Sequence, residues 1–262
     1  MTAPEAGGDA EKTRAVLRFK DGDGEHAIPI PVPPAHATVL DLLPAAREIS
    51  GHTTALALDR ESAAGRTISC RAGCGACCRQ LVAISVVEAE SLAQLVAAMP
   101  EERAAVIRSR FAAAVKRLEA AELLSTQDTP GNRALEVKDA NDVETALRKI
   151  SRRYFSLGIA CPFLENESCS IHPQRPMVCR EYHVTSPAEK CARLYDTEVD
   201  RVLGPVRMGE VLARTFAKVT AGETFMIPLV LSLEWSAAHS AEITAPHEGR
   251  TLMNAMVGEI GR

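Results

Sequence analysis

The sequence is poor in aromatic residues and contains no long apolar run. One Trp, three Tyr and six Phe make up 4% of its 262 residues. The longest apolar stretches, at 81–87 and 225–233, are much shorter than the roughly 18 residues that span a bilayer. We therefore expect no membrane association.

No excess of one charge is present. Thirty Lys and Arg residues face 34 Asp and Glu residues, and no basic stripe with interleaved aromatics occurs, so nothing indicates a nucleic-acid partner. Residues 1–13 also lack the basic start and apolar stretch of a secretory signal. We expect a disordered leader there and a cytoplasmic location, where reduced thiols argue against disulfides.

Common catalytic patterns are missing too. No strand followed by Gly-x-Gly and a helix is found, which disfavours a nucleotide-like cofactor held in that way. No nucleophile or acid–base pair stands out. The catalytic residues are thus unknown, and whether the protein is an enzyme stays open.

The local patterns predict a mainly α protein with a small N-terminal β-hairpin, its helices packed around irregular cysteine-rich loops. Alternating segments at 14–19 and 26–32 flank Asp21-Gly22-Asp23-Gly24, a hairpin signal. Ser85 and Glu88 have capping-box spacing before a helix at 86–99, which we expect to pair antiparallel with one at 101–124. Further helices are predicted near 39–49, 142–157, 206–219, 229–240 and 251–260, and one that begins at Ser186-Pro187.

These elements suggest three ordered segments after the leader. Residues 14–64 hold the hairpin and a short helix, and residues 196–262 form a C-terminal helical region. Between them, residues 65–195 form a cysteine-rich metal-binding domain. Within that domain the polar, turn-rich stretch 125–139 is expected to be an exposed loop.

Eight cysteines fall into two groups of four. The first, Cys70, Cys74, Cys77 and Cys78, lies within nine residues and includes Gly73 and Gly75, which permit tight turns. The second comprises Cys161, Cys169, Cys179 and Cys191. Several thiolates on short loops can converge on one centre, so all eight are candidate metal ligands.

The arrangement of these ligands leaves several possibilities. Adjacent side chains point in different directions, so Cys77 and Cys78 are more easily divided between two centres than shared by one. We expect the two groups to meet in space. His172 and His183 follow cysteines closely, but the sequence leaves their role open.

The cysteine motifs resemble those of the CxxCxxCC, or YkgJ-type, cysteine-cluster family over about residues 65–195. The resemblance is carried by Cys74-Gly75-Ala76-Cys77-Cys78, Cys161-Pro162-Phe163-Leu164, Cys169-Ser170-Ile171-His172 and Arg175-Pro176 through Cys179-Arg180. It implies chelation of zinc or iron, or an iron–sulfur cluster. Three residues separate Cys70 from Cys74, where the family has two, and His172 stands at a position that is usually aromatic.

We favour an iron–sulfur centre with an electron-transfer or oxidoreductase role and an unidentified redox or protein partner. Four arginines near the cysteines could offset a negative cluster: Arg71, Arg79, Arg175 and Arg180. The main alternative is a zinc- or iron-chelating protein without catalysis. A minor one is a cluster-dependent methyltransferase, from the resemblance to a flagellin lysine methylase, or an S-adenosylmethionine enzyme, from the spacing Cys70-x3-Cys74-x2-Cys77.

Overall fold

The computed structural model describes residues 13–22, 24–125, 128–137 and 142–261. The predicted leader at 1–13 lies outside them except for its last residue, as does part of the predicted loop at 125–139. The described chain is mainly α-helical, as expected, with small antiparallel strand pairs. No helix in this part of the chain is both long and apolar enough to cross a membrane.

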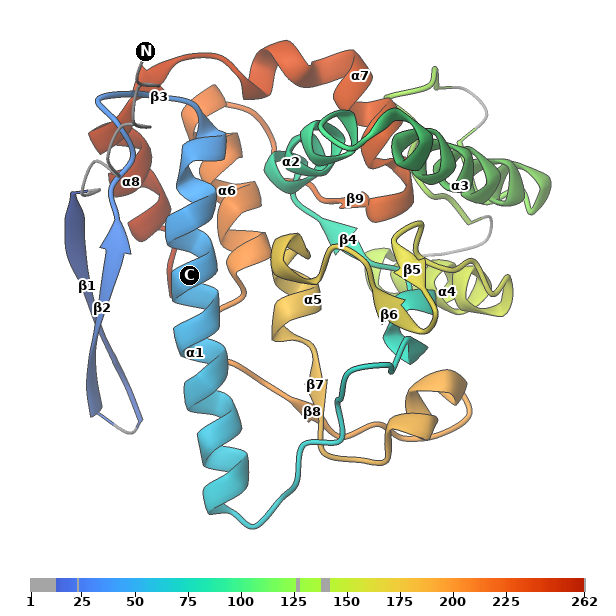
Figure 1. Ribbon diagram of the computed structural model, residues 1–262, viewed down its shortest axis with the longest axis horizontal. Coiled ribbons are helices and arrows are strands. Elements are labelled where there is room, and N and C mark those ends of the chain that lie inside the picture. Colours follow the sequence, from blue (N-terminus) through green and yellow to red (C-terminus); the bar gives the residue numbers. More distant parts are fainter. Residues whose placement is uncertain (1–12, 23, 126–127, 138–141, 262) are drawn as a thin grey trace, which may run out of the picture.

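The predicted N-terminal hairpin is present. Strands β1 (Arg14–Asp21) and β2 (Gly24–Pro31) pair antiparallel, and β2 packs on helix α1 (Leu43–Ala63). Figure 1 shows the hairpin lying along α1 on the side away from α6 (Met208–Thr220). The hairpin thus covers one flank of the helical core.

Helix α1 is much longer than the helix predicted near 39–49. A 3-10 turn, η1 (Val39–Leu42), precedes it, and α1 then continues without interruption for 21 residues. Its buried positions beyond Ile49 are Ser50, Thr53 and Ala57. These residues are small or polar, so they give no apolar periodicity from which the helix could be predicted.

Helices α2 (Val86–Ala97) and α3 (Glu101–Ala120) occur where the sequence predicts helices. Ser85 and Glu88 form the expected capping box. However, α2 packs chiefly against α7 (Ser232–Ile243) and touches α3 much less. The main packing partner of α2 is therefore distant in the sequence, and its contact with α3 is the smaller one.

The predicted exposed loop is anchored in its described part. Residue Ser125 donates its backbone N–H to Ala134, and Glu136 donates to Leu123. The Arg133 guanidinium forms ion pairs with Glu119 and Glu234 and is only 12% exposed. Residues 128–137 are therefore a mostly exposed turn that is fastened to α7.

The remaining helices are α4 (Val143–Ser156), α5 (Met177–Glu181) and α8 (Gly249–Val257). Residue Asp142 caps α4 by accepting the Thr145 N–H. Instead of the helix expected after Ser186, a 3-10 turn, η4 (Ala188–Arg193), follows, and the Ser186 hydroxyl accepts the Asp200 N–H. The remaining 3-10 turns are η2 (Ala76–Arg79), η3 (His172–Gln174) and η5 (Leu229–Leu231).

The short strands form two-stranded antiparallel pairs throughout the described residues. The pairs are β3 (His36–Ala37) with β10 (His247–Glu248), β4 (Ala83–Ile84) with β9 (Ile227–Pro228), β5 (Leu164–Glu165) with β6 (Ser168–Cys169), and β7 (His183–Val184) with β8 (Arg201–Val202). The S-adenosylmethionine alternative requires a barrel of alternating strands and helices with parallel strands, which such antiparallel pairs cannot form.

One large hydrophobic core draws on all three of the predicted segments. It includes Ile30 and Ile49 from the first, Leu92 and Phe163 from the second, and Leu212 from the third. The boundaries predicted near residues 64 and 195 therefore do not separate independent cores. The cysteine-bearing segments lie at one edge of this core, next to α5 (Figure 1).

Candidate metal centre

The first group of cysteines lies on a loop that ends in the 3-10 turn η2. We call this loop the first cysteine segment, and the stretch that carries Cys161, Cys169 and Cys179 the second. Cys70 is exposed, and Cys74, Cys77 and Cys78 are half-buried. Gly73 has a φ of 79°, a left-handed conformation that favours glycine. The segment therefore follows a tight path that brings its thiols to one side of the core.

Three cysteines of the second group lie at separate places along the chain. Cys161 follows α4, Cys169 ends the small hairpin β5–β6, and Cys179 lies within α5. Short backbone hydrogen bonds hold this segment together: Leu164 donates to Cys161, and Ser170 donates to Phe163. The fixed positions of these elements set where the three thiols can point.

The two segments meet, as predicted. The Cys161 N–H donates to the Cys78 carbonyl at 2.7 Å, and Ser69 donates to Val184 at 2.9 Å. Between the segments lies a cavity of about 610 Å³, which we call the thiol cavity. Seven cysteines line it: Cys70, Cys74, Cys77, Cys78, Cys161, Cys169 and Cys179.

That Cys77 and Cys78 serve separate centres stays a prediction, but their thiols are not apart in space. Both line the thiol cavity, and a hydrogen bond from one thiol to the other raises the pKa of Cys77. In the 3-10 turn η2 the two side chains can reach the same space. Adjacency in sequence therefore does not prevent both thiols from facing one cavity.

Cys191 is the cysteine that does not line the thiol cavity. It is buried on η4, and its Sγ lies 4.0 Å from the Tyr182 hydroxyl. Burial raises its pKa, with smaller contributions from Cys70, Cys77 and Cys74. Cys191 is therefore close to the first group of thiols but is separated from the cavity wall.

The thiols are spread over the cavity wall. Within the described residues, no three His, Cys, Asp or Glu side chains are already gathered as a single metal ion would require. A cysteine sulfur moves by rotation about one side-chain torsion, and a preformed site is uncommon before metal binds. The donor set thus fits a metal centre that draws several thiolates inward.

Of the four arginines expected near a cluster, Arg175 fits that role best. It lines the thiol cavity, and its Nε is buried with no hydrogen-bond partner in the part of the chain that the structure describes. Arg71 and Arg79 form ion pairs with glutamates, and the Arg180 side chain donates to backbone carbonyls. A guanidinium with a free donor beside the thiols can offset the charge of bound thiolates.

Burial controls the protonation of the deepest thiols. It raises the pKa of Cys161 to about 12 and that of Cys179 well above its ordinary value. Burial also raises the pKa of Cys169, against which the Arg175 charge acts as one smaller opposing effect. At neutral pH these thiols are therefore protonated until a metal displaces the protons.

We expect metal affinity to fall as the pH is lowered from 8 to 6. Each thiol proton that the metal must displace weakens binding about tenfold per pH unit. Competition with a chelator of known affinity at several pH values measures this dependence. An affinity that stays constant after correction for the chelator would show that no thiol proton is released.

The metal-free protein should show the opposite trend in stability. Folding raises the pKa of these thiols. Their contribution to the stability of the fold is therefore fully present below the thiol pKa of the unfolded chain, about 8.5, and is lost as the pH rises above that pKa. Denaturant unfolding at pH 8 and pH 10 under reducing conditions should therefore show lower stability at pH 10. Equal thiol titration in the folded and unfolded chains would contradict this expectation.

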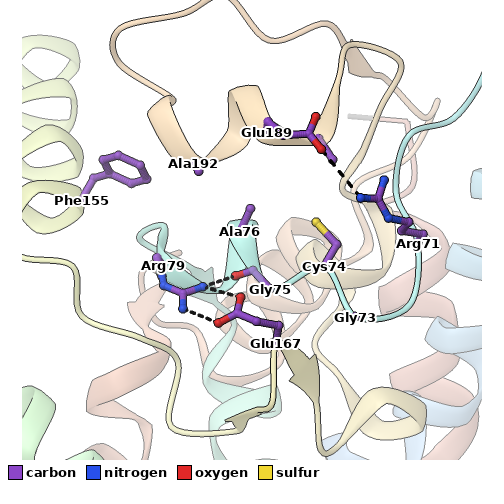
Figure 2. A pocket seen from close by; sticks show the side chains of 11 residues that line it. Arg71, Gly73, Cys74, Gly75, Ala76, Arg79, Phe155, Glu167, Glu189 and Ala192 are labelled. Carbon is purple, nitrogen blue, oxygen red and sulfur yellow. Dashed lines mark hydrogen bonds and ion pairs between the residues drawn. The ribbon is translucent and has the colours of Figure 1, made fainter.

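A second cavity, of about 290 Å³, lies beside the first cysteine segment. Figure 2 shows Arg79 turned toward Glu167 and Arg71 toward Glu189, with the Cys74 sulfur between the two pairs. Cys74 lines both cavities. Cys74 therefore lies between the thiol cavity and this second, more open cavity.

Gly75 fixes the contact between the two segments at this point. A Cβ there would lie 2.7 Å from both Glu167 Oε2 and Leu164 Cδ1, and 3.2 Å from the Glu167 Cα. The Arg79 side chain donates to the Gly75 carbonyl and to Glu167. A side chain at residue 75 would therefore force the Glu167 and Leu164 side chains of the β5–β6 hairpin to shift.

We expect Gly75→Ala to lower the free energy of unfolding by about 1–3 kcal/mol, because the new methyl group overpacks this contact. Gly51→Ala is the matched control, since nothing lies within 4 Å of that position in α1. Alanine there should be stabilising by about 0.5–1 kcal/mol. Urea unfolding of both variants tests the pair, and equal effects would refute the packing argument.

Comparison with protein families finds a match for the cysteine-bearing part of the chain. A family model named CxxCxxCC, with the description "Putative zinc- or iron-chelating domain", matches residues 69–197. The chain carries a CxxCxxCC-family domain. No curated protein and no solved structure matches the chain.

The CxxCxxCC domain includes all eight cysteines and both segments that border the thiol cavity. Metal chelation is the function that this family supports. Sequence reasoning missed two features of the site: the wall contributed by Leu229 from η5, and the buried Glu88 that holds the start of α5. Only the capping spacing of Glu88 could have drawn attention to it.

Proposed function

We propose that the CxxCxxCC domain holds an iron–sulfur centre in the thiol cavity and that this centre transfers electrons. The observation that carries the proposal is the lining of one cavity of about 610 Å³ by seven thiols from both segments. A single zinc ion takes four ligands. Seven thiols and a cavity of this size fit a larger, polynuclear centre better.

The residues around the cavity support this choice. The buried Nε of Arg175 can donate to a metal-bound sulfur, and hydrogen bonds and positive charge near sulfur raise the reduction potential of a cluster. The chain's own role would be to hold the thiolates, to restrict water and to set the potential. A bound cluster would supply the one-electron chemistry.

The surface near Cys74 suggests where a redox partner approaches. Arg71 and Glu189 form an exposed ion pair beside this thiol, and Cys70 is exposed nearby. We propose that electrons pass through this face to a protein partner. Free thiols of this kind suit a reducing, cytoplasmic setting.

The experiment is purification without oxygen, followed by metal analysis, sulfide analysis and a visible spectrum. We expect iron, acid-labile sulfide and absorption in the visible range. Zinc without sulfide would instead establish the alternative, a structural or chelating site in which metal fastens the two segments together. Protein that contains neither metal after reconstitution with Fe²⁺ and sulfide, or with Zn²⁺, would contradict a chelating function.

A further inference from the structure

His183 lines the thiol cavity but is not part of the cysteine ligand set. Its Nδ1 is buried and has no hydrogen-bond partner among the residues that the structure describes. A buried polar atom without a partner destabilises a fold by about 1–3 kcal/mol. A metal ion bound at this nitrogen would remove that cost.

The state of the ring suits a metal ligand. Burial lowers the pKa of His183, and the Arg175 guanidinium lowers it further, against the smaller effect of the Glu181 backbone carbonyl. The ring is therefore neutral at pH 7. Only neutral imidazole has the free lone pair with which a histidine nitrogen binds zinc or iron.

The backbone around His183 is held where the two cysteine segments meet. His183 pairs with Val202 in the β7–β8 ladder. The next residue, Val184, accepts the N–H of Ser69, which immediately precedes Cys70. The preceding residue, Tyr182, contacts Cys191 and accepts a hydrogen bond from Gln80. The backbone that carries this cavity-lining residue is thus fixed on a strand.

We propose that Nδ1 of His183 is a ligand of the metal centre, which then has a mixed thiolate and imidazole shell. The inference rests on the proposed metal-binding function. It holds for either metal, because structural zinc sites accept three cysteines and one histidine, and histidine replaces cysteine on iron in some iron–sulfur clusters.

His172 provides a matched comparison. It also lines the thiol cavity, but it is exposed. Arg175, burial and Arg180, in decreasing order of effect, lower its pKa, so its ring is likewise neutral. A His172 variant therefore tests whether any neutral histidine at this cavity has the same effect.

The test is X-ray absorption at the edge of the metal found in full-length protein purified without oxygen. We expect a nitrogen neighbour at about 2.0–2.1 Å beside sulfurs at about 2.3 Å. The nitrogen signal should persist in His172→Ala and disappear in His183→Ala. If the centre is paramagnetic, ¹⁵N-labelled histidine should change its pulsed electron paramagnetic resonance spectrum in the parent and in His172→Ala only.

The outcomes separate this inference from the proposed function. A sulfur-only shell in the unaltered protein contradicts the assignment of His183 while leaving metal binding intact. Persistence of the nitrogen signal in folded His183→Ala, checked by circular dichroism, contradicts it too. A chain that binds no metal contradicts the proposed function and this inference together. The measurement on the unaltered protein does not depend on whether a variant folds.

Discussion

Replacing Cys179 with serine is expected to lower the metal content per chain by at least half and to expose Cys74 and Cys77 to thiol-labelling reagents. Cys179 belongs to the second cysteine group but lines the same cavity as the first. Loss of its thiolate weakens a centre whose binding energy is shared by both segments. Metal analysis and mass spectrometry after labelling measure the two effects.

The matched control is Cys191→Ser. Its thiol is buried but does not line the thiol cavity, so this variant should retain more metal than Cys179→Ser. If the two variants lose metal equally, Cys191 is a ligand and the cavity wall does not define the ligand set. If Cys179→Ser leaves Cys74 and Cys77 fully protected, the two groups act independently.

Replacing Glu88 with alanine is expected to reduce the free energy of unfolding by about 3–5 kcal/mol, because several buried hydrogen-bond donors lose the acceptor that they share. The Glu88 carboxylate is buried and accepts the Met177 N–H at 2.7 Å and the Ser85 hydroxyl at 2.7 Å. Arg47 faces it and is half-buried. The variant would leave the Met177 N–H and the Ser85 hydroxyl without their acceptor and would remove the negative charge near Arg47.

The same change should weaken metal binding, because Met177 begins α5 and Cys179 lies two residues further along. Guanidinium unfolding of metal-free protein measures the stability, and metal titration measures the second effect. Glu102→Ala, at an exposed position in the first turn of α3, is the control and should change stability by less than about 0.5 kcal/mol. Similar stability of both variants would show that Glu88 does not anchor α5.

Much of the local structure could be predicted because short-range interactions determine it. The hairpin at residues 14–31 follows from its turn residues and alternating strands, and the start of α2 follows from Ser85 and Glu88. The ligand types could also be read from the spacing of the cysteines. These features depend on residues that are close together in the sequence.

The tertiary structure decided which of these residues act together. The backbone contact between Cys161 and Cys78 and the choice of α7 as the partner of α2 join residues far apart in the chain. The burial of Nδ1 of His183 beside the thiols is likewise a product of packing. Sequence by itself determined the chemistry available to the site. Its geometry was decided by long-range packing, because distant segments acquire fixed neighbours only when one shared core is buried.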